Sequence, residues 1–368
     1  MAKTSFVPSG ARIKVIGLGG GGCNAVTRMV REQIRGVEFI AMNTDAQHLA
    51  VTEAAVRIQL GERITRGLGA GGDHVLGQKA ADESRDEIKQ TVSGADMVFV
   101  TCGMGGGTGT GSIPMIAQFA KQSGALTIAV VTRPFSFEGT HRGQVAEEGI
   151  MGLMDKVDTL IIIPNDRLLE LCDQKMSVDN AFKLADEILY HGVQAIAEVV
   201  TVPGLINLDF ADVRTVMKDA GPAWMSIGRG SGQNRARDAA KQALASPLLD
   251  VSIEGAKGVL FNIAGSNLTL FEVNEAAEVI RQAIDPEANV IFGVVLDPNM
   301  GNDVRLTLIA TGFATREALT GAAWEKELAR LLKGKSEEEL EVPSFLRYRH
   351  ALPGQRPYLA SPGKPPAR

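Results

Sequence analysis

Hydrophobic residues along this chain form short runs that alternate with polar segments of helical spacing. Five runs rich in β-branched residues each precede such a segment, at residues 12–18, 37–43, 95–103, 126–134 and 158–166. Runs that are apolar almost throughout and are separated by helices are typical of parallel strands buried on both faces. The first part of the chain is therefore predicted to be a parallel sheet covered by helices on both sides.

A long helical pattern follows at residues 178–200. Its apolar positions recur every three or four residues and so share one helix face; they are Ala181, Phe182, Ala185, Ile188, Leu189 and Val193. Pro203 and Gly204 end the pattern, and a further helix begins near Phe210. Strand runs then return at 222–228, 257–265, 289–297 and 304–313, with helices at about 234–245 and 272–284. This pattern predicts a second, smaller α/β domain.

The length of 368 residues agrees with two packed units, because a single hydrophobic core stops growing near ~250–300 residues. We divide the chain into six segments: a flexible N-terminus (1–11), a first α/β domain (12–177), a central helix with the loop after it (178–220), a C-terminal α/β domain (221–314), a short charged linker (315–339) and a C-terminal peptide with a basic, Pro-rich tail (340–368).

Composition narrows the classes of function. The net charge of -5 argues against a nucleic-acid partner. Cys23, Cys102 and Cys172 are far apart and match neither a disulfide framework nor a zinc spacing. The N-terminus lacks the apolar stretch of a signal peptide, and no run of about 18 apolar residues occurs. We therefore expect a cytoplasmic protein without a membrane span.

Candidate chemistry is concentrated in glycine-rich loops that follow predicted strands. The loop GLGGGGCN at 17–24 opens a helix, so its backbone amides and the helix dipole face any bound anion. It also satisfies G-x-G-x-x-G through Gly17, Gly19 and Gly22, with Asp45 near the distance of a ribose-binding acid. On this loop alone, a nicotinamide-dependent oxidoreductase with a Rossmann domain is an equal alternative.

A second loop, GMGGGTGTG at 103–111, favours a different nucleotide site. It contains six glycines and two threonines in nine residues, which is typical of a backbone cradle for phosphate. Neither loop has the G-K-[ST] ending of a P-loop, so amides, helix ends and Mg²⁺ must balance the phosphate charge. A third stretch, GLGAGG at 67–72, could equally be a plain flexible loop.

These motifs carry a resemblance to a known family. The sequence GGGTGTG at 105–111 is similar to the tubulin signature, and GGGGCNAV, NTDAQHL, GLGAGG, VVTRPFSFEGTHR and NLDFADVRTVM occur in the order found in FtsZ. The resemblance covers roughly residues 13–313. It implies the tubulin/FtsZ fold, a GTPase that is activated by self-assembly into head-to-tail filaments, and a role in bacterial division. A GTP-binding filament with little turnover is the alternative within this family.

The resemblance assigns the loops and neighbouring residues to GTP or GDP and its Mg²⁺. The phosphates would lie among Gly20, Gly21, Gly22, Gly71, Gly72, Gly105, Gly106, Gly107, Thr108, Gly109 and Thr110. The resemblance further implies contacts from Asn43 and Thr132, and no dedicated protein cage for the metal. The phosphate assignment agrees with what the loops indicate by themselves.

The base and ribose contacts have plainer alternatives. Asn24 would contact guanine or ribose, or it could cap the first helix. Glu138 and Arg142 would contact the ribose side of GTP, or could form a surface ion pair. Asn165 is a further guanine or ribose candidate that ends the run at 158–166.

Phe182 and Asp186 are four residues apart and so share one helix face. An aromatic ring there can pack on a purine while the carboxylate accepts the two donors of guanine, N1–H and N2–H. Adenine presents an acceptor at N1 and would leave the carboxylate unpaired. The alternative is a core phenylalanine beside a solvated aspartate.

Asp209 and Asp212 stand three apart at a predicted helix start, where acids commonly act as caps. The resemblance implies that Asn207, Asp209 and Asp212 act on the nucleotide of the neighbouring subunit, near a site for K⁺ or another cation. Both interpretations are compatible.

The C-terminal region departs from the family in having only a short charged linker. The segment EVPSFLR at 341–347 resembles the peptide that docks on membrane-anchoring division proteins, with Pro343, Phe345, Leu346 and Arg347 as its anchors. The basic tail after it is either ordinary solvated chain or a weak contact for anionic lipid. The resemblance places the protein at the division site, on the inner face of the membrane.

Overall fold

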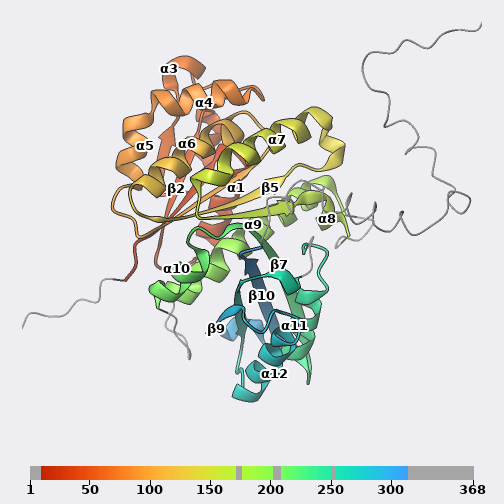
Figure 1. The fold of residues 1–368 in the computed structure, drawn as a ribbon. Coiled ribbons are helices and arrows are strands. Elements are labelled where there is room, and N and C mark those ends of the chain that lie inside the picture. Colours follow the sequence, from red (N-terminus) through yellow and green to blue (C-terminus); the bar gives the residue numbers. More distant parts are fainter. Residues whose placement is uncertain (1–9, 171–175, 202–208, 250–252, 314–368) are drawn as a thin grey trace, which may run out of the picture. The chain divides into compact units, whose positions relative to one another are not determined.

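A computed structural model describes residues 10–170, 176–201, 209–249 and 253–313, all within one compact unit (Figure 1). The other segments, which include Cys172, Asn207 and the predicted linker and docking peptide, lie outside the described residues. None of the helices in the described ranges is both long enough and apolar enough to span a bilayer.

The first domain is built on six parallel strands in the order β3-β2-β1-β4-β5-β6. Their bounds are β1 Ile13–Leu18, β2 Val37–Asn43, β3 Val56–Gln59, β4 Met97–Gly103, β5 Leu126–Arg133 and β6 Thr159–Pro164. The predicted parallel sheet is confirmed, although β3 was not predicted. This strand has only four residues, two of them Arg57 and Gln59, so it lacks an apolar run.

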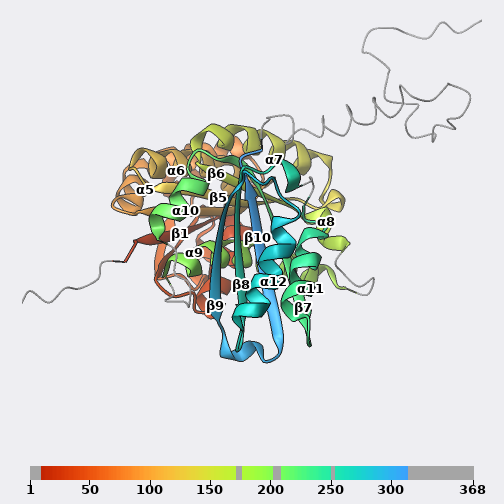
Figure 2. The ribbon, with the colours of Figure 1, turned by 60° about the horizontal axis from the view of Figure 1, so that its bottom comes forward.

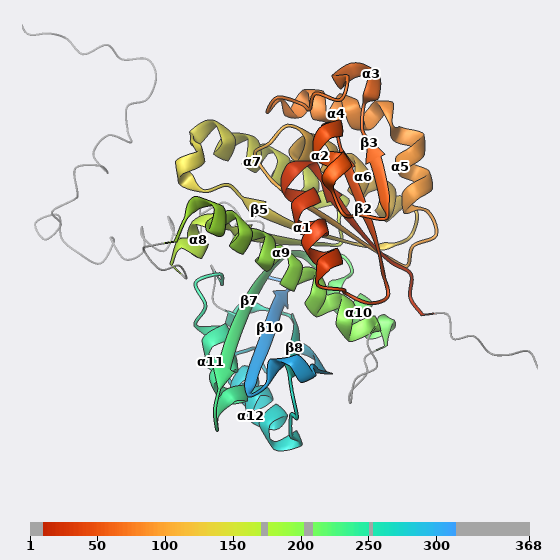
Figure 3. The ribbon, with the colours of Figure 1, turned by 180° about the vertical axis from the view of Figure 1, so that it is seen from behind.

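Helices cover both faces of this sheet. They are α1 Gly19–Arg31, α2 Ala46–Val51, α3 Glu62–Thr65, α4 His74–Glu83, α5 Arg85–Val92, α6 Thr108–Gln122, α7 Thr140–Leu153, α8 Asn165–Leu169, α9 Val178–Thr201 and α10 Phe210–Met217, with short 3-10 turns η1 Ser136–Glu138 and η2 Met154–Lys156. Helix α6 packs on β4 and β5, and it also contacts α4, α5 and α7 on the same side of the sheet (Figure 1). Helices α1 and α9 lie on the opposite face (Figure 3).

The C-terminal domain adds four strands in the order β7-β10-β8-β9, and the start of β7 pairs in parallel with β6, so the ten strands form one continuous sheet. They are β7 Gly221–Ser231, β8 Gly258–Gly265, β9 Asn289–Leu296 and β10 Asp303–Thr311; β10 is antiparallel to both neighbours and β8 is parallel to β9. Helices α11 Arg235–Leu244 and α12 Leu270–Arg281 cover one face (Figure 2), and two 3-10 turns, η3 Ile253–Gly255 and η4 Pro298–Met300, complete the domain.

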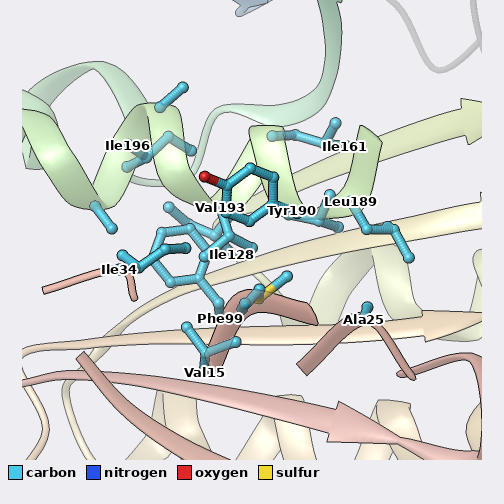
Figure 4. Close-up of a cluster of buried hydrophobic side chains, with 14 of the residues drawn as sticks. Val15, Ala25, Ile34, Phe99, Ile128, Ile161, Leu189, Tyr190, Val193 and Ile196 are labelled. Carbon is cyan, nitrogen blue, oxygen red and sulfur yellow. The ribbon is translucent and has the colours of Figure 1, made fainter. Parts of the chain in front are cut away.

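Helix α9 is shared by the two domains. Its residues Leu189, Tyr190, Val193 and Ile196 enter the buried cluster that Val15, Phe99 and Ile128 form on the first sheet (Figure 4). The same helix also contacts β8, β9 and β10 of the second domain. Each fully buried side chain of this size contributes ~1.5–3 kcal/mol to stability, so the core holds α9 firmly beside the carboxyl ends of the first sheet.

Candidate functional site

Two glycine-rich loops meet at the carboxyl edge of the first sheet. Strand β1 leads into α1 and strand β4 into α6, and the two strands are parallel neighbours, so both loops leave the sheet at the same edge. Gly19, with φ of +65°, stands so close to the second loop that a Cβ on it would lie 2.9 Å from the Gly109 nitrogen. Any larger residue at Gly19 would push the loops apart.

A cavity of about 390 Å³ opens beside these loops. The residues that the sequence predicted and that line it are Gly20, Gly21, Asn24, Gly106, Gly107, Thr108, Gly109, Thr132, Glu138, Arg142, Asn165, Phe182 and Asp186. The remaining lining residues, which were not among the individually predicted contacts although four of them belong to the two glycine-rich loops, are Leu18, Gly19, Gly103, Met104, Pro134, Ala185 and Leu189. The cavity therefore joins segments that are more than 160 positions apart in the chain.

One end of the cavity is rich in backbone donors. Helices α1 and α6 begin there without any side-chain cap, so the amides of their first turns are available to a ligand. A Cβ placed on Gly20 or Gly106 would meet no protein atom within 4 Å. These loops are therefore open toward the cavity, and an anion fits there on chemical grounds.

The threonines of the second loop have different partners. The Thr108 hydroxyl lies 2.6 Å from the Thr44 hydroxyl at the cavity wall. The Thr110 hydroxyl accepts a hydrogen bond from the Gly105 amide at 2.9 Å. Neither Gly105 nor Thr110 lines the cavity; this pair closes the loop from within.

Several other residues of the predicted phosphate set stand back from the cavity. Gly22 is buried, and a Cβ on it would lie 2.4 Å from the Thr101 carbonyl oxygen, so it allows α1 to pack on the sheet. Gly71 and Gly72 are exposed and have positive φ angles of 58° and 85°. Their loop reaches the donor-rich end of the cavity through Ala70, against which Gly107 packs.

The opposite end of the cavity has an aromatic wall and unpaired acceptors. Phe182 meets the ring of Phe135 edge to face, with centroids 5.4 Å apart. Burial raises the pKa of Asp186 to about 7, an effect that the charge of Arg28 partly offsets. The Oδ1 atom of Asn165 is buried without a hydrogen-bond partner. Buried acceptors of this kind are costly unless a ligand donates to them.

Glu138 and Arg142 do form the ion pair that their spacing allowed, at 2.6 Å. Glu138 also accepts a hydrogen bond from the Phe135 amide at 2.8 Å. The pair lines the cavity, so it holds the segment that carries Phe135 next to the site. An ion pair and a ligand contact are thus compatible here.

Asn24 cannot cap the first helix, which corrects one alternative for this residue. Helix α1 begins at Gly19 after Leu18, so Asn24 lies more than one turn inside it. Its side chain contacts His48, with Oδ1 3.0 Å from Nε2. Asn43, predicted from the resemblance, is buried and outside the lining, where its Nδ2 lies 3.2 Å from His48 Nδ1. His48 belongs to the motif NTDAQHL that carried the resemblance, but no role was predicted for it.

The predicted acids Asp209 and Asp212 do not line this cavity. Asp209 occupies the N-cap position of α10 without a side-chain capping bond, and Asp212 lies in the first turn. Asn207 and the docking residues Pro343, Phe345, Leu346 and Arg347 fall outside the described residues. Within the described ranges, no three His, Cys, Asp or Glu side chains gather as a metal cluster.

Comparison with known proteins agrees with this geometry. Residues 12–173 match the GTPase domain of the Tubulin/FtsZ family, and residues 221–314 match the C-terminal domain of the FtsZ family. An empty FtsZ dimer from M. jannaschii is 47% identical over 83% of this chain and 89% of that chain, with a TM-score of 0.81.

More distant solved structures share the fold. CetZ2 from Haloferax volcanii, a GTPγS-bound protofilament, is 18% identical over 88% of this chain and all of that chain, with a TM-score of 0.70. CetZ1 from the same organism, a GDP-bound monomer, is 21% identical over 87% of this chain and 99% of that one, with a TM-score of 0.72. The FtsZ identity, with both domain matches, decides against a nicotinamide-dependent enzyme: the chain belongs to the Tubulin/FtsZ family of GTPases.

Proposed function

We propose that this chain binds GTP in the cavity between α1, α6 and α9, hydrolyses it, and assembles head to tail into filaments of the FtsZ type. The observation that carries the proposal is the pairing of opposite chemistries in one cavity. Uncapped helix starts offer donors at one end, and Asp186 and Asn165 offer unpaired acceptors at the other. A guanine nucleotide carries acceptor phosphates and a donor base edge at matching ends.

The phosphates lie against the first turns of α1 and α6, where Gly20, Gly106 and Gly107 leave the backbone open. Helix dipoles and amides stabilise the negative charge there. Arg142, already paired with Glu138, lies close enough to face the ribose or phosphates. Mg²⁺, when bound with the phosphates, neutralises charge that develops during transfer to water.

Guanine lies beside Phe182, with its N1–H and N2–H groups donating to Asp186. The Asn165 Oδ1 atom is a further acceptor. Adenine presents no such pair of donors, and it would leave Asp186 buried without a partner. The site therefore selects GTP over ATP.

Hydrolysis requires a second subunit. The acids Asp209 and Asp212 lie outside the nucleotide cavity, at the start of α10. In a head-to-tail contact they face the γ-phosphate of the neighbour and orient water, with K⁺ or another cation close by. Such a contact is heterologous and need not close, so it propagates as a filament. The FtsZ dimer and the CetZ2 protofilament among the solved structures support self-association.

The cellular role proposed is bacterial division, at the inner face of the membrane. The segment around Pro343, Phe345 and Leu346 would dock on a membrane-anchoring division protein, and the basic tail after it could add weak attraction to anionic lipid. Pull-down of the full chain with and without residues 341–347 from a lysate of dividing cells tests it, and equal capture of anchor proteins would contradict it.

Sedimentation and phosphate release measured on the same samples test the enzymatic proposal. We expect pelleting and phosphate release with GTP, pelleting that decays as GTP is consumed, and neither with ATP. Filaments without phosphate release would instead support the alternative within the family, a GTP-binding filament with little turnover. Activation by self-assembly predicts that the rate of phosphate release rises more than linearly with protein concentration. A linear or weaker rise would contradict it.

A further inference from the structure

We propose that His48 is a positioning residue for the nucleotide site: it orients the side chain of Asn24 so that the amide nitrogen of Asn24 donates to the bound nucleotide. This inference rests on the proposed function of the cavity. His48 lies on α2 and lines no part of the cavity itself, whereas Asn24 does. The two residues are joined by a single contact of 3.0 Å.

The direction of that contact follows from a chain of hydrogen bonds. The Asp45 amide donates to Oδ1 of Asn43 at 3.3 Å, which turns the Asn43 amide nitrogen toward His48. That nitrogen lies 3.2 Å from Nδ1 of His48. An amide nitrogen can only donate, so Nδ1 must accept.

The tautomer of His48 is thereby determined. A neutral imidazole that accepts at Nδ1 carries its proton at Nε2. His48 Nε2–H therefore donates to Oδ1 of Asn24. Because the Oδ1 atom of Asn24 accepts this hydrogen bond, its Nδ2 group remains available as a donor. Nδ2 makes no hydrogen bond within the described residues. The nucleotide thus meets a donor at Asn24.

The surrounding structure holds this relay in place. Asp45 caps α2, accepting from the amides of Gln47 and His48 at 2.9 and 3.1 Å. Asn43 ends β2 and is only 3% exposed. The Thr52 hydroxyl donates to the backbone oxygen of His48 at 2.9 Å. These contacts hold the backbone of His48 in place, and they would remain if its side chain were replaced.

This arrangement also explains Asn43. The residue was expected to touch the nucleotide, but it is buried outside the cavity. Its effect reaches the nucleotide through two further hydrogen bonds, by setting which nitrogen of His48 carries the proton. Asn43 is therefore a second positioning residue, which acts on His48 and through it on Asn24.

A double-mutant cycle on the full chain tests the proposal, with the dissociation constant for GTP as the readout. We expect His48→Ala and Asn24→Ala each to weaken binding by about 3- to 10-fold, as for one neutral hydrogen bond. We expect the double variant to bind GTP as the Asn24→Ala variant does, within about twofold. Losses that multiply in the double variant would show that His48 acts independently of Asn24, and would overturn the inference.

Two conservative variants sharpen the test. His48→Gln places an amide nitrogen where Nε2 stands and should restore most of the affinity. His48→Asn reaches only the position of Nδ1 and should behave like His48→Ala. Equal affinities of these two variants would contradict the relay, provided that both keep the thermal midpoint of the parent. Failure of the parent chain itself to bind GTP would instead refute the proposed function.

Discussion

Arg28 of α1 and Glu187 of α9 form an ion pair, with 3.2 Å between Nη2 and Oε2. Arg229 of β7 reaches the other oxygen of Glu187 at 3.1 Å, and Nε2 of His191 lies 3.5 Å from it. Glu187 therefore ties the helix of the first glycine loop and the strand of the second domain to α9. His191, and then the two guanidinium groups, hold the pKa of Glu187 at about 2 despite its partial burial.

Replacing Glu187 by Gln should lower the free energy of unfolding by about 1–2 kcal/mol at pH 7, because two arginines lose their anion. The depressed pKa means that this contribution is complete above about pH 4.5 and is lost as pH falls toward 2. Urea unfolding at several pH values would measure it. Arg229→Ala is the control: its side chain is 66% exposed, so we expect a loss below ~1 kcal/mol. A constant difference between parent and Glu187→Gln from pH 7 to pH 3 would refute this account.

Gly22→Ala and Gly20→Ala should separate stability from binding. A Cβ on Gly22 would lie 2.4 Å from the Thr101 carbonyl oxygen, so helix and strand must move apart, at a cost of about 1–3 kcal/mol or more. A Cβ on Gly20 meets open space in the cavity. That variant should keep its thermal midpoint and lose affinity for GTP. Unchanged GTP affinity in Gly20→Ala would place the phosphates elsewhere.

Asp186→Ala should weaken GTP binding by about 10- to 100-fold, as expected for hydrogen bonds worth ~1.5–3 kcal/mol to a charged group. The preference for GTP over ATP should shrink by a similar factor. Phe182→Ala should weaken both nucleotides alike, because ring packing does not depend on the donor pattern of the purine. Competition binding on both variants decides this. An unchanged preference in Asp186→Ala would move the specificity to Asn24 or Asn165.

GTP affinity should depend on pH through Asp186. Its pKa of about 7 in the free protein leaves the carboxyl protonated below that value, whereas guanine needs the ionised form. Affinity should therefore rise with pH and level off above 7, being about tenfold weaker at pH 6 than at pH 8. Comparison with Asp186→Ala cancels the titration of the phosphates themselves. Identical pH profiles of the two proteins would contradict the assignment.

Asp212→Ala should bind GTP nearly as the parent does but hydrolyse it far more slowly, since in the proposed filament the acid acts on the nucleotide of a neighbouring subunit. A variant blocked in its own phosphate loop, Gly106→Asp, should lose binding. Mixed together, the two should regain part of the phosphate release, because some interfaces pair both intact halves. No recovery in the mixture, or equal loss of GTP binding by Asp212→Ala alone, would contradict a shared site.

Local sequence patterns predicted the main framework of this fold. Apolar runs marked five of the six strands of the first sheet, and the three- to four-residue spacing from Val178 predicted α9 almost to its last residue, Thr201. These features depend on neighbours within a few positions, where strand pleat and helix period are set. The glycine-rich loops could also be predicted locally, because the backbone freedom and exposed amides of glycine follow from the residue type itself.

Only the tertiary structure decided which side chains meet. Arg28 and Glu187 are 159 positions apart, and Asn24 and His48 are 24 apart. Residues so far apart share no helix or strand periodicity, so the sequence pattern could not predict either contact. The unpaired oxygen of Asn165 and the raised pKa of Asp186 arise from burial by distant segments. A residue's type determines which bonds it can form, but long-range packing determines which of those bonds exist. That packing brings two glycine-rich loops and one face of α9 together around a single cavity.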